Sequence, residues 1–166
     1  MPFPVNKFRT KIFNNTIISS GGRNIYFVHN KNVNAYTLIT NNIIYGNGSG
    51  VGIEEGSSNN SPSYLENNSL YNLSNLYYDY ETSSYKNTIS AVNGLLDITY
   101  NYNNISSNPL FVNEGNSDYH IQSTSPCKDS GKDVNSSLYS LINYDYDYQS
   151  RPYNSTYDIG ADEYMP

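Results

Sequence analysis

A seven-residue phrase built around two adjacent asparagines recurs along the first half of the chain and constrains the fold more than any other feature. It reads IFNNTII at residues 12–18, ITNNIIY at 39–45 and LENNSLY at 65–71, so the copies lie 27 and 26 residues apart. Self-similarity at a fixed period of this length indicates stacked structural units. Because each unit buries its apolar face mainly against its neighbours, several repeats are needed for stability.

Each repeat is predicted to consist of short strands separated by turns. Apolar runs such as IYFVH at 25–29 and VGI at 51–53 have strand length and are bounded by Gly, Ser and Asn. No segment shows ten residues of helical periodicity. Two or three strands in about 26 residues is the size of one coil of a right-handed parallel β-helix, whereas leucine-rich repeats require a regular run of leucines that this chain lacks.

The paired asparagines are predicted to form corners between strands. Asn tolerates the left-handed conformation that a sharp bend demands, and in stacked repeats its amide can donate to one equivalent Asn and accept from the next. We therefore expect Asn15, Asn42 and Asn68 to form a structural ladder, with the flanking apolar residues pointing inward.

Composition limits the class of protein. A chain of 166 residues favours a single domain, residues 1–166. Residues 79–166 hold twelve Asp and Glu against four Lys and Arg, so this half lacks the basic face that nucleic-acid binding requires. No apolar run approaches the roughly 18 residues of a membrane span, which argues against membrane insertion, and no signal peptide is visible.

Two C-terminal segments carry a resemblance to a known family. Residues 108–131, NPLFVNEGNSDYHIQSTSPCKDSG, and 145–164, DYDYQSRPYNSTYDIGADEY, resemble the terminal signature of secreted right-handed parallel β-helix repeat proteins of the choice-of-anchor type, which are related in fold to pectate lyases. Asn108, Cys127, Lys128 and Gln149 depart from the usual motif.

The resemblance implies an all-β solenoid in one domain and an extracellular or cell-surface location. Residues 1–107 would form three to four coils with a loop insertion around 77–85, and residues 108–166 would close the C-terminal end of the stack. Such a stack must be capped because its last coil otherwise exposes unpaired backbone groups.

A calcium site is one interpretation of the C-terminal acids. Asp145 and Asp147 alternate in YDYDY, so a strand would place both carboxylates on one face. Ca²⁺ prefers several oxygen ligands, and further acids lie nearby at Asp158, Asp162 and Glu163. The alternative interpretation is a set of turn caps with an ion pair to Arg151.

Tyrosine, with 19 copies, is the surface-relevant excess. A tyrosine ring offers a flat apolar face with a polar edge, which suits sugar rings and protein partners alike. The residues expected to lie in the inserted loop and contact a ligand are Tyr77, Tyr78, Tyr80 and Tyr85. The competing explanation is a compositional bias without function.

Evidence for catalysis is sparse. A glycosidase needs paired carboxylates, and a polysaccharide lyase needs a basic residue with calcium. The candidates are Glu54, Glu55, Asp97, Arg23 and Lys31, but no acid column lines up between repeats. Both histidines, His29 and His120, are interpreted as structural, and Cys127 as a buried inert thiol.

Three functions remain open from the sequence. The first is a non-catalytic extracellular or cell-surface module with an adhesive, carbohydrate-contacting or assembly role, whose partner is a polysaccharide or a surface protein. The second is a carbohydrate-active enzyme, a polysaccharide lyase or glycosidase. The third is a filament subunit that stacks head to tail through its N-terminal coil, because a heterologous contact need not close. No cofactor other than calcium is expected.

Overall fold

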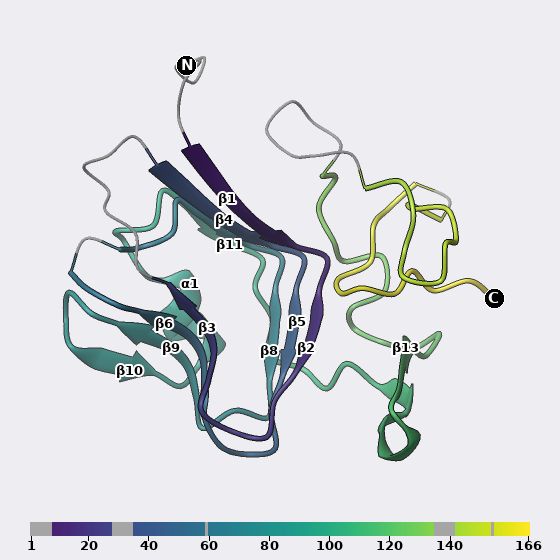
Figure 1. The fold of residues 1–166 in the computed structure, drawn as a ribbon, viewed down its shortest axis with the longest axis horizontal. Coiled ribbons are helices and arrows are strands. Elements are labelled where there is room, and N and C mark those ends of the chain that lie inside the picture. Colours follow the sequence, from purple (N-terminus) through teal and green to yellow (C-terminus); the bar gives the residue numbers. More distant parts are fainter. Residues whose placement is uncertain (1–7, 28–34, 59, 135–141, 154) are drawn as a thin grey trace.

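A computed structural model describes residues 8–27, 35–58, 60–134, 142–153 and 155–166 (Figure 1). The strands within these ranges form four separate sheets, three of them mainly parallel, and the described helices are short. The prediction of an all-β chain is therefore confirmed. His29 and Lys31 lie outside the described residues. No helix in the described ranges is long and apolar enough to cross a membrane.

Each of the first three repeats supplies one strand to each of three sheets. The first sheet contains β1 (Phe8–Phe13), β4 (Ala35–Thr40), β7 (Tyr64–Glu66) and β11 (Tyr100–Tyr102), all parallel. The second contains β2 (Thr16–Ile18), β5 (Ile43–Tyr45) and β8 (Ser69–Tyr71). The third contains β3 (Arg23–Phe27), β6 (Val51–Glu55), β9 (Asn75–Asp79) and the antiparallel β10 (Ser84–Lys86).

Equivalent residues of successive repeats are paired across these sheets. Ile12 lies opposite Ile39, which lies opposite Leu65, and the same order holds for Ile17, Ile44 and Leu70. A parallel ladder stacks like side chains at the spacing of neighbouring strands, about 4.8 Å. The apolar positions of the phrase therefore form continuous columns.

The first asparagine of each phrase makes the bend between the first and second sheets. Asn14, Asn41 and Asn67 have φ values of 53°, 56° and 51°. Asn is among the few residues other than Gly that enter this left-handed region at low cost. The bend therefore selects Asn for a backbone reason.

The second asparagine of each phrase makes the ladder. Asn15 Nδ2 donates to Asn42 Oδ1 at 2.9 Å, and Asn42 Nδ2 donates to Asn68 Oδ1 at 3.0 Å. The column continues from Asn68 Nδ2 to Asn104 Oδ1 at 2.9 Å, across a sequence separation of 36 residues. Asn104 is a fourth member that the regular period did not reveal, because β10 and the following helix lengthen this repeat.

The main core fills the space between the three sheets. Ile39, Ile44, Ile53 and Leu70 are fully buried in it. The short helix α1 (Ile89–Asn93) inserts Val92 into the same cluster. Asn101 Nδ2 donates to Val92 O at 2.7 Å, so α1 is bonded directly to the last repeat. This helix was not expected from the sequence.

The C-terminal segment runs along the side of the stacked strands (Figure 1). It contains β12 (Phe111–Asn113), the 3-10 turn η1 (Glu114–Asn116) and β13 (Asp118–Ile121). Its buried side chains pack against the outer faces of the parallel sheets in two clusters. One cluster joins Phe111, Ile121, Cys127 and Ile159 to Ile43, and the other joins Val134 and Tyr157 to Leu38 and Tyr64.

Hydrogen bonds from the corner asparagines fix this segment in place. Asn41 Nδ2 donates to Lys132 O at 2.8 Å, and Asn41 Oδ1 accepts from Lys132 N at 2.8 Å. Asn14 Nδ2 donates to Asp158 O at 3.3 Å. The segment was expected to close the end of the stack. It instead contacts the corners of successive repeats, and α1 packs at the last repeat.

Candidate functional site

A row of aromatic and charged side chains follows the outer face of the third sheet. Tyr26 on β3 pairs in register with Glu54 on β6, Glu54 with Tyr78 on β9, and Tyr78 with Tyr85 on β10. Because strand residues alternate between faces, this row is opposite in direction to Ile25, Ile53 and Tyr77, which point into the core. We call Tyr26, Glu54, Tyr78 and Tyr85 the tyrosine row.

The tyrosine row exposes flat rings beside a charge pair. Tyr26 and Tyr85 are 49% and 56% exposed, and the Tyr78 and Tyr85 ring centroids lie 4.8 Å apart. Arg23 Cζ lies 4.8 Å from the Tyr26 centroid, and Arg23 Nε lies 2.8 Å from Glu54 Oε2. The surface thus combines apolar ring faces with tyrosine hydroxyls and the Arg23 guanidinium, which covers the buried Glu54 carboxylate.

The expected loop at 77–85 is a hairpin of β9 and β10, which separates the four tyrosines predicted in it. Tyr77 is fully buried, and its hydroxyl donates to Glu55 Oε1 at 2.6 Å. The prediction that Tyr77 contacts a ligand is therefore wrong. Tyr78 lies in the row, and Tyr80 packs edge-on against Tyr78 with ring centroids 6.1 Å apart.

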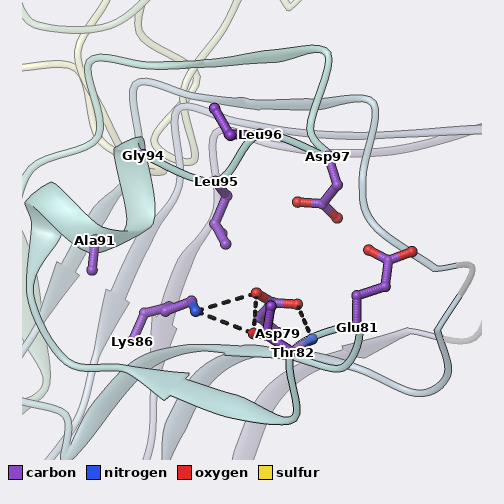
Figure 2. A pocket seen from close by; sticks show the side chains of 9 residues that line it. All are labelled: Asp79, Glu81, Thr82, Lys86, Ala91, Gly94, Leu95, Leu96 and Asp97. Carbon is purple, nitrogen blue, oxygen red and sulfur yellow. Dashed lines mark hydrogen bonds and ion pairs between the residues drawn. The ribbon is translucent and has the colours of Figure 1, made fainter.

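An acidic cavity of about 350 Å³ opens beside the same hairpin (Figure 2). In this view Asp97 lies above Glu81 on the same side, and Asp79 lies beside Thr82. Ser61 Oγ hydrogen-bonds to Asp97 and lies 3.4 Å from Glu81 Oε2. Carboxylate oxygens of Glu55, Asp79 and Glu81 lie within 4.8 Å of one another.

The polar partners of the buried acids restrict what this cavity can do. Burial raises the pKa of Glu55, although hydrogen bonds from Tyr77 and from the Tyr80 N–H oppose the rise. Burial likewise opposes ionisation of Asp79, but hydrogen bonds from Thr82 and Lys86 hold its pKa below the usual value. The carboxylate oxygens of Glu55 and Asp79 therefore already accept hydrogen bonds from protein donors.

The candidate catalytic residues divide between two faces. Glu54 pairs with Arg23 outside the sheet, whereas Glu55 points inward, as expected for adjacent strand residues. Asp97 lies in the loop after α1 and joins the cluster through Ser61. Nothing in the repeat pattern signals the meeting of Asp97 with Ser61, because residues 80–99 have no counterpart in the other repeats.

The predicted calcium ligands are not brought together. Asp145 and Asp147 lie in a turn, where Asp145 Oδ1 accepts from the Asp147 N–H at 2.9 Å. The expectation that they share one face of a strand is wrong. Asp158 caps other backbone groups, accepting from the N–H groups of Asp129 and Tyr164. Arg151 Nε pairs with Glu163 Oε2 at 2.8 Å, so these residues follow the turn-cap and ion-pair interpretation.

Asp147 instead belongs to a cluster around His120. His120 Nδ1 lies 2.5 Å from Asp118 Oδ1, and Nε2 lies 2.5 Å from Asp147 Oδ2. Partial burial lowers the pKa of His120, but the two carboxylates outweigh it and raise that pKa to about 9. His120 therefore holds the 145–149 turn against β13.

Comparison with known proteins adds no family to these observations. The chain matches no family model, no curated protein and no solved structure. The resemblance of its C-terminal motifs to secreted β-helix proteins stays a prediction.

Proposed function

We propose that this chain is a non-catalytic, carbohydrate-contacting module of an extracellular or cell-surface protein. The observation that carries the proposal is the tyrosine row, in which the exposed rings of Tyr26 on β3 and Tyr85 on β10 lie in register with the half-buried ring of Tyr78 on β9. Tyr26 and Tyr78 are two strands apart, which is about 10 Å. A polysaccharide lying across the strands would meet successive rings.

The charge around the row favours a neutral polysaccharide over a uronic acid polymer. Arg23 and Glu54 neutralise each other within the row. The cavity on the opposite face of β9 and β10 contributes Asp79, Glu81 and Asp97 against Lys86, and the whole chain carries a net charge of −6. An acidic polymer would be repelled by this field at low ionic strength.

We also infer that the three parallel sheets are the faces of one right-handed parallel β-helix of three to four coils. The chain enters the sheets in the same order in each repeat, and the asparagine ladder links the corners of consecutive repeats. In such a solenoid the outer face of one sheet is a continuous platform, which is the geometry that the tyrosine row needs.

The proposal is tested by binding to neutral polysaccharides. Affinity electrophoresis in gels that contain soluble β-glucans, xylans or mannans should show retardation of the wild-type chain. Tyr26→Ala with Tyr85→Ala should reduce the retardation at least tenfold, because exposed ring surface is lost while Tyr77 stays in the core.

The matched control is Tyr148→Ala, which removes a tyrosine that is 86% exposed on the C-terminal segment, outside the row. This variant should bind like wild type. Absence of retardation of the folded wild-type chain in every polysaccharide, or equal binding by the double variant, would remove the proposal.

An enzyme is the alternative that the acidic cavity favours. A carbohydrate-active enzyme, a lyase or a glycosidase, would use Glu81 and Asp97, the two carboxylates that Ser61 contacts. Release of reducing or unsaturated sugars that is lost in Asp97→Asn and retained in Tyr26→Ala would select this function over binding alone.

A filament subunit is the alternative that the sheet order favours. In the described strands, β1, β2 and β3 occupy one edge of their respective sheets, and edge strands present unpaired backbone groups. Head-to-tail self-association through this N-terminal side should produce fibres that lengthen with protein concentration under the electron microscope.

A further inference from the structure

Three ligand atoms from distant parts of the C-terminal segment converge beside β13. They belong to His120 on β13, Asp147 in the 145–149 turn, and Asp162 near the C-terminus, and they lie within 4.8 Å of one another. One nitrogen and two carboxylate oxygens at this separation form a donor set suited to a transition metal.

The ring of His120 is oriented for coordination through Nε2. A carboxylate only accepts hydrogen bonds, so the 2.5 Å contact with Asp118 Oδ1 places a proton on Nδ1. In the neutral ring the lone pair is then on Nε2, which faces the cluster. A carboxylate that fixes the remote nitrogen of a metal-binding histidine is a common outer contact of zinc sites.

The groups that meet at Nε2 do not satisfy one another in the neutral ring. Asp147 Oδ2 lies 2.5 Å and the Tyr146 hydroxyl 2.7 Å from this single nitrogen. Tyr146 can donate to the lone pair, but Asp147 then has no proton to accept. In the metal-free chain the doubly protonated imidazolium satisfies Asp147, and a divalent cation that displaces the Nε2 proton would occupy the same place between Nε2 and Asp147.

The third ligand is fixed and the site has open space. Asp162 is almost fully buried, and its Oδ2 accepts from the Ile121 N–H at 2.8 Å, which holds the carboxylate beside β13. A cavity of about 180 Å³ lies against His120, Gln149 and Asp162. It leaves room for a water molecule in a fourth position.

We propose that His120 Nε2, Asp147 and Asp162 bind one Zn²⁺ ion, with Asp118 as a positioning residue. Bonds of about 2.0 to 2.2 Å place neighbouring tetrahedral ligands roughly 3.3 Å apart, so Asp147 moves outward by under about 1 Å on binding. Its side chain is part-exposed in a turn, which permits that movement. Ca²⁺ fits less well, because it takes six to eight oxygen ligands.

The test is equilibrium dialysis of the chelator-treated full chain against ZnCl₂, with metal analysis of the retained protein. Wild type should bind one Zn²⁺ per chain and should keep it in a tenfold excess of CaCl₂. Asp147→Asn and His120→Gln should weaken binding at least tenfold, and Asp118→Asn by about 10- to 100-fold. Co²⁺ should give the visible absorption of a tetrahedral site in wild type and lose it in His120→Gln.

Two controls separate this site from other ligands of the chain. Asp129→Asn changes a surface carboxylate of the same segment and should bind as wild type does, and so should His29→Gln, which removes the other histidine. Circular dichroism of each metal-free variant checks folding. If His120→Gln does not fold, Asp147→Asn decides the question, because it alters only a part-exposed turn residue.

The proposal is overturned if folded wild type retains no Zn²⁺ at submillimolar concentration, since His120 is then only an imidazolium bridge between Asp118 and Asp147. It is also overturned if Zn²⁺ binds equally well to Asp147→Asn and His120→Gln. Displacement of Zn²⁺ by equimolar Ca²⁺ would indicate an oxygen-only site elsewhere and would equally contradict it.

Discussion

At the scale of single residues, the two adjacent asparagines of each repeat have different structural roles. Asn41 adopts a positive φ and turns its amide outward to Lys132. Asn42 is fully buried and turns its amide into the column between Asn15 and Asn68. The twin amides persist in each repeat because one bends the backbone and the other satisfies the strand ends that the bend leaves behind.

Replacement of Asn42 by Ala should destabilise the chain more than the same change at the end of the ladder. Asn42 Nδ2 also donates to Ile12 O at 2.8 Å. Removal of the Asn42 amide therefore leaves several buried donors and acceptors without a hydrogen-bond partner. We expect Asn42→Ala to lower the free energy of unfolding by roughly 3 kcal/mol, measured by urea denaturation, and the exposed Asn15→Ala by about 1 kcal/mol. Equal losses would contradict the ladder as a buried network.

At the scale of elements, residues 77–85 form a hairpin of β9 and β10, although the sequence predicted a loop there. The stretch YYDYETSSY at 77–85 looks polar, because the residue that points inward is a tyrosine rather than an aliphatic side chain. Tyr77 can be buried in the core because its hydroxyl donates a hydrogen bond to Glu55 Oε1. The alternation of strand faces is present, but composition conceals it.

Removal of this hydroxyl should have a pH-dependent cost. Burial raises the pKa of Glu55 above 4.5, and the Tyr77 hydrogen bond limits the rise. A carboxyl whose pKa is higher in the folded than in the unfolded state lowers stability as pH rises from the unfolded to the folded value, because the folded state then binds more protons. Tyr77→Phe increases that difference.

The loss of unfolding free energy in Tyr77→Phe should therefore be larger at pH 7, roughly 2 kcal/mol, than at pH 4. Denaturant titrations at the two pH values measure it. Tyr85→Phe on the exposed side of the hairpin is the control and should show the same small change at both. A loss in Tyr77→Phe that does not depend on pH would show that Glu55 is uncharged throughout.

At the scale of the whole molecule, the C-terminal segment clamps the repeats from the side. Its residues reach corners in successive repeats, so one segment links elements far apart in the chain. Cys127 lies on the inner side of this segment, fully buried in a cluster with Ile43 and Ile159, and burial raises its thiol pKa to about 11. Reaction of this thiol requires the segment to open.

Thiol labelling at pH 8 should therefore report opening of the segment. Labelling of the folded wild type should be far slower than that of the urea-unfolded chain, since the thiol is both covered and protonated. Asn41→Ala removes two hydrogen bonds to Lys132 and should speed labelling about five- to tenfold. Asn15→Ala should not, and equal rates for both variants would contradict a clamp held by the corner amides.

The sequence by itself determined the all-β class, the repeat, the corner at each asparagine pair and the members of the ladder that follow the regular period. Periodic information of this kind survives in one dimension, because stacked repeats place equivalent residues together by construction. The sequence pattern did not predict Asn104 as a member of the ladder, because β10 and α1 lengthen the repeat before it to 36 residues.

Only the tertiary structure decided the rest. The path of residues 108–166 along the side of the repeats, the cavity that joins Glu81 to Asp97, and the cluster of His120, Asp147 and Asp162 all depend on how non-repeating segments return to the stack. No period relates such residues, and their meeting is settled by the burial of Ile43, Leu38 and the outer faces of the sheets.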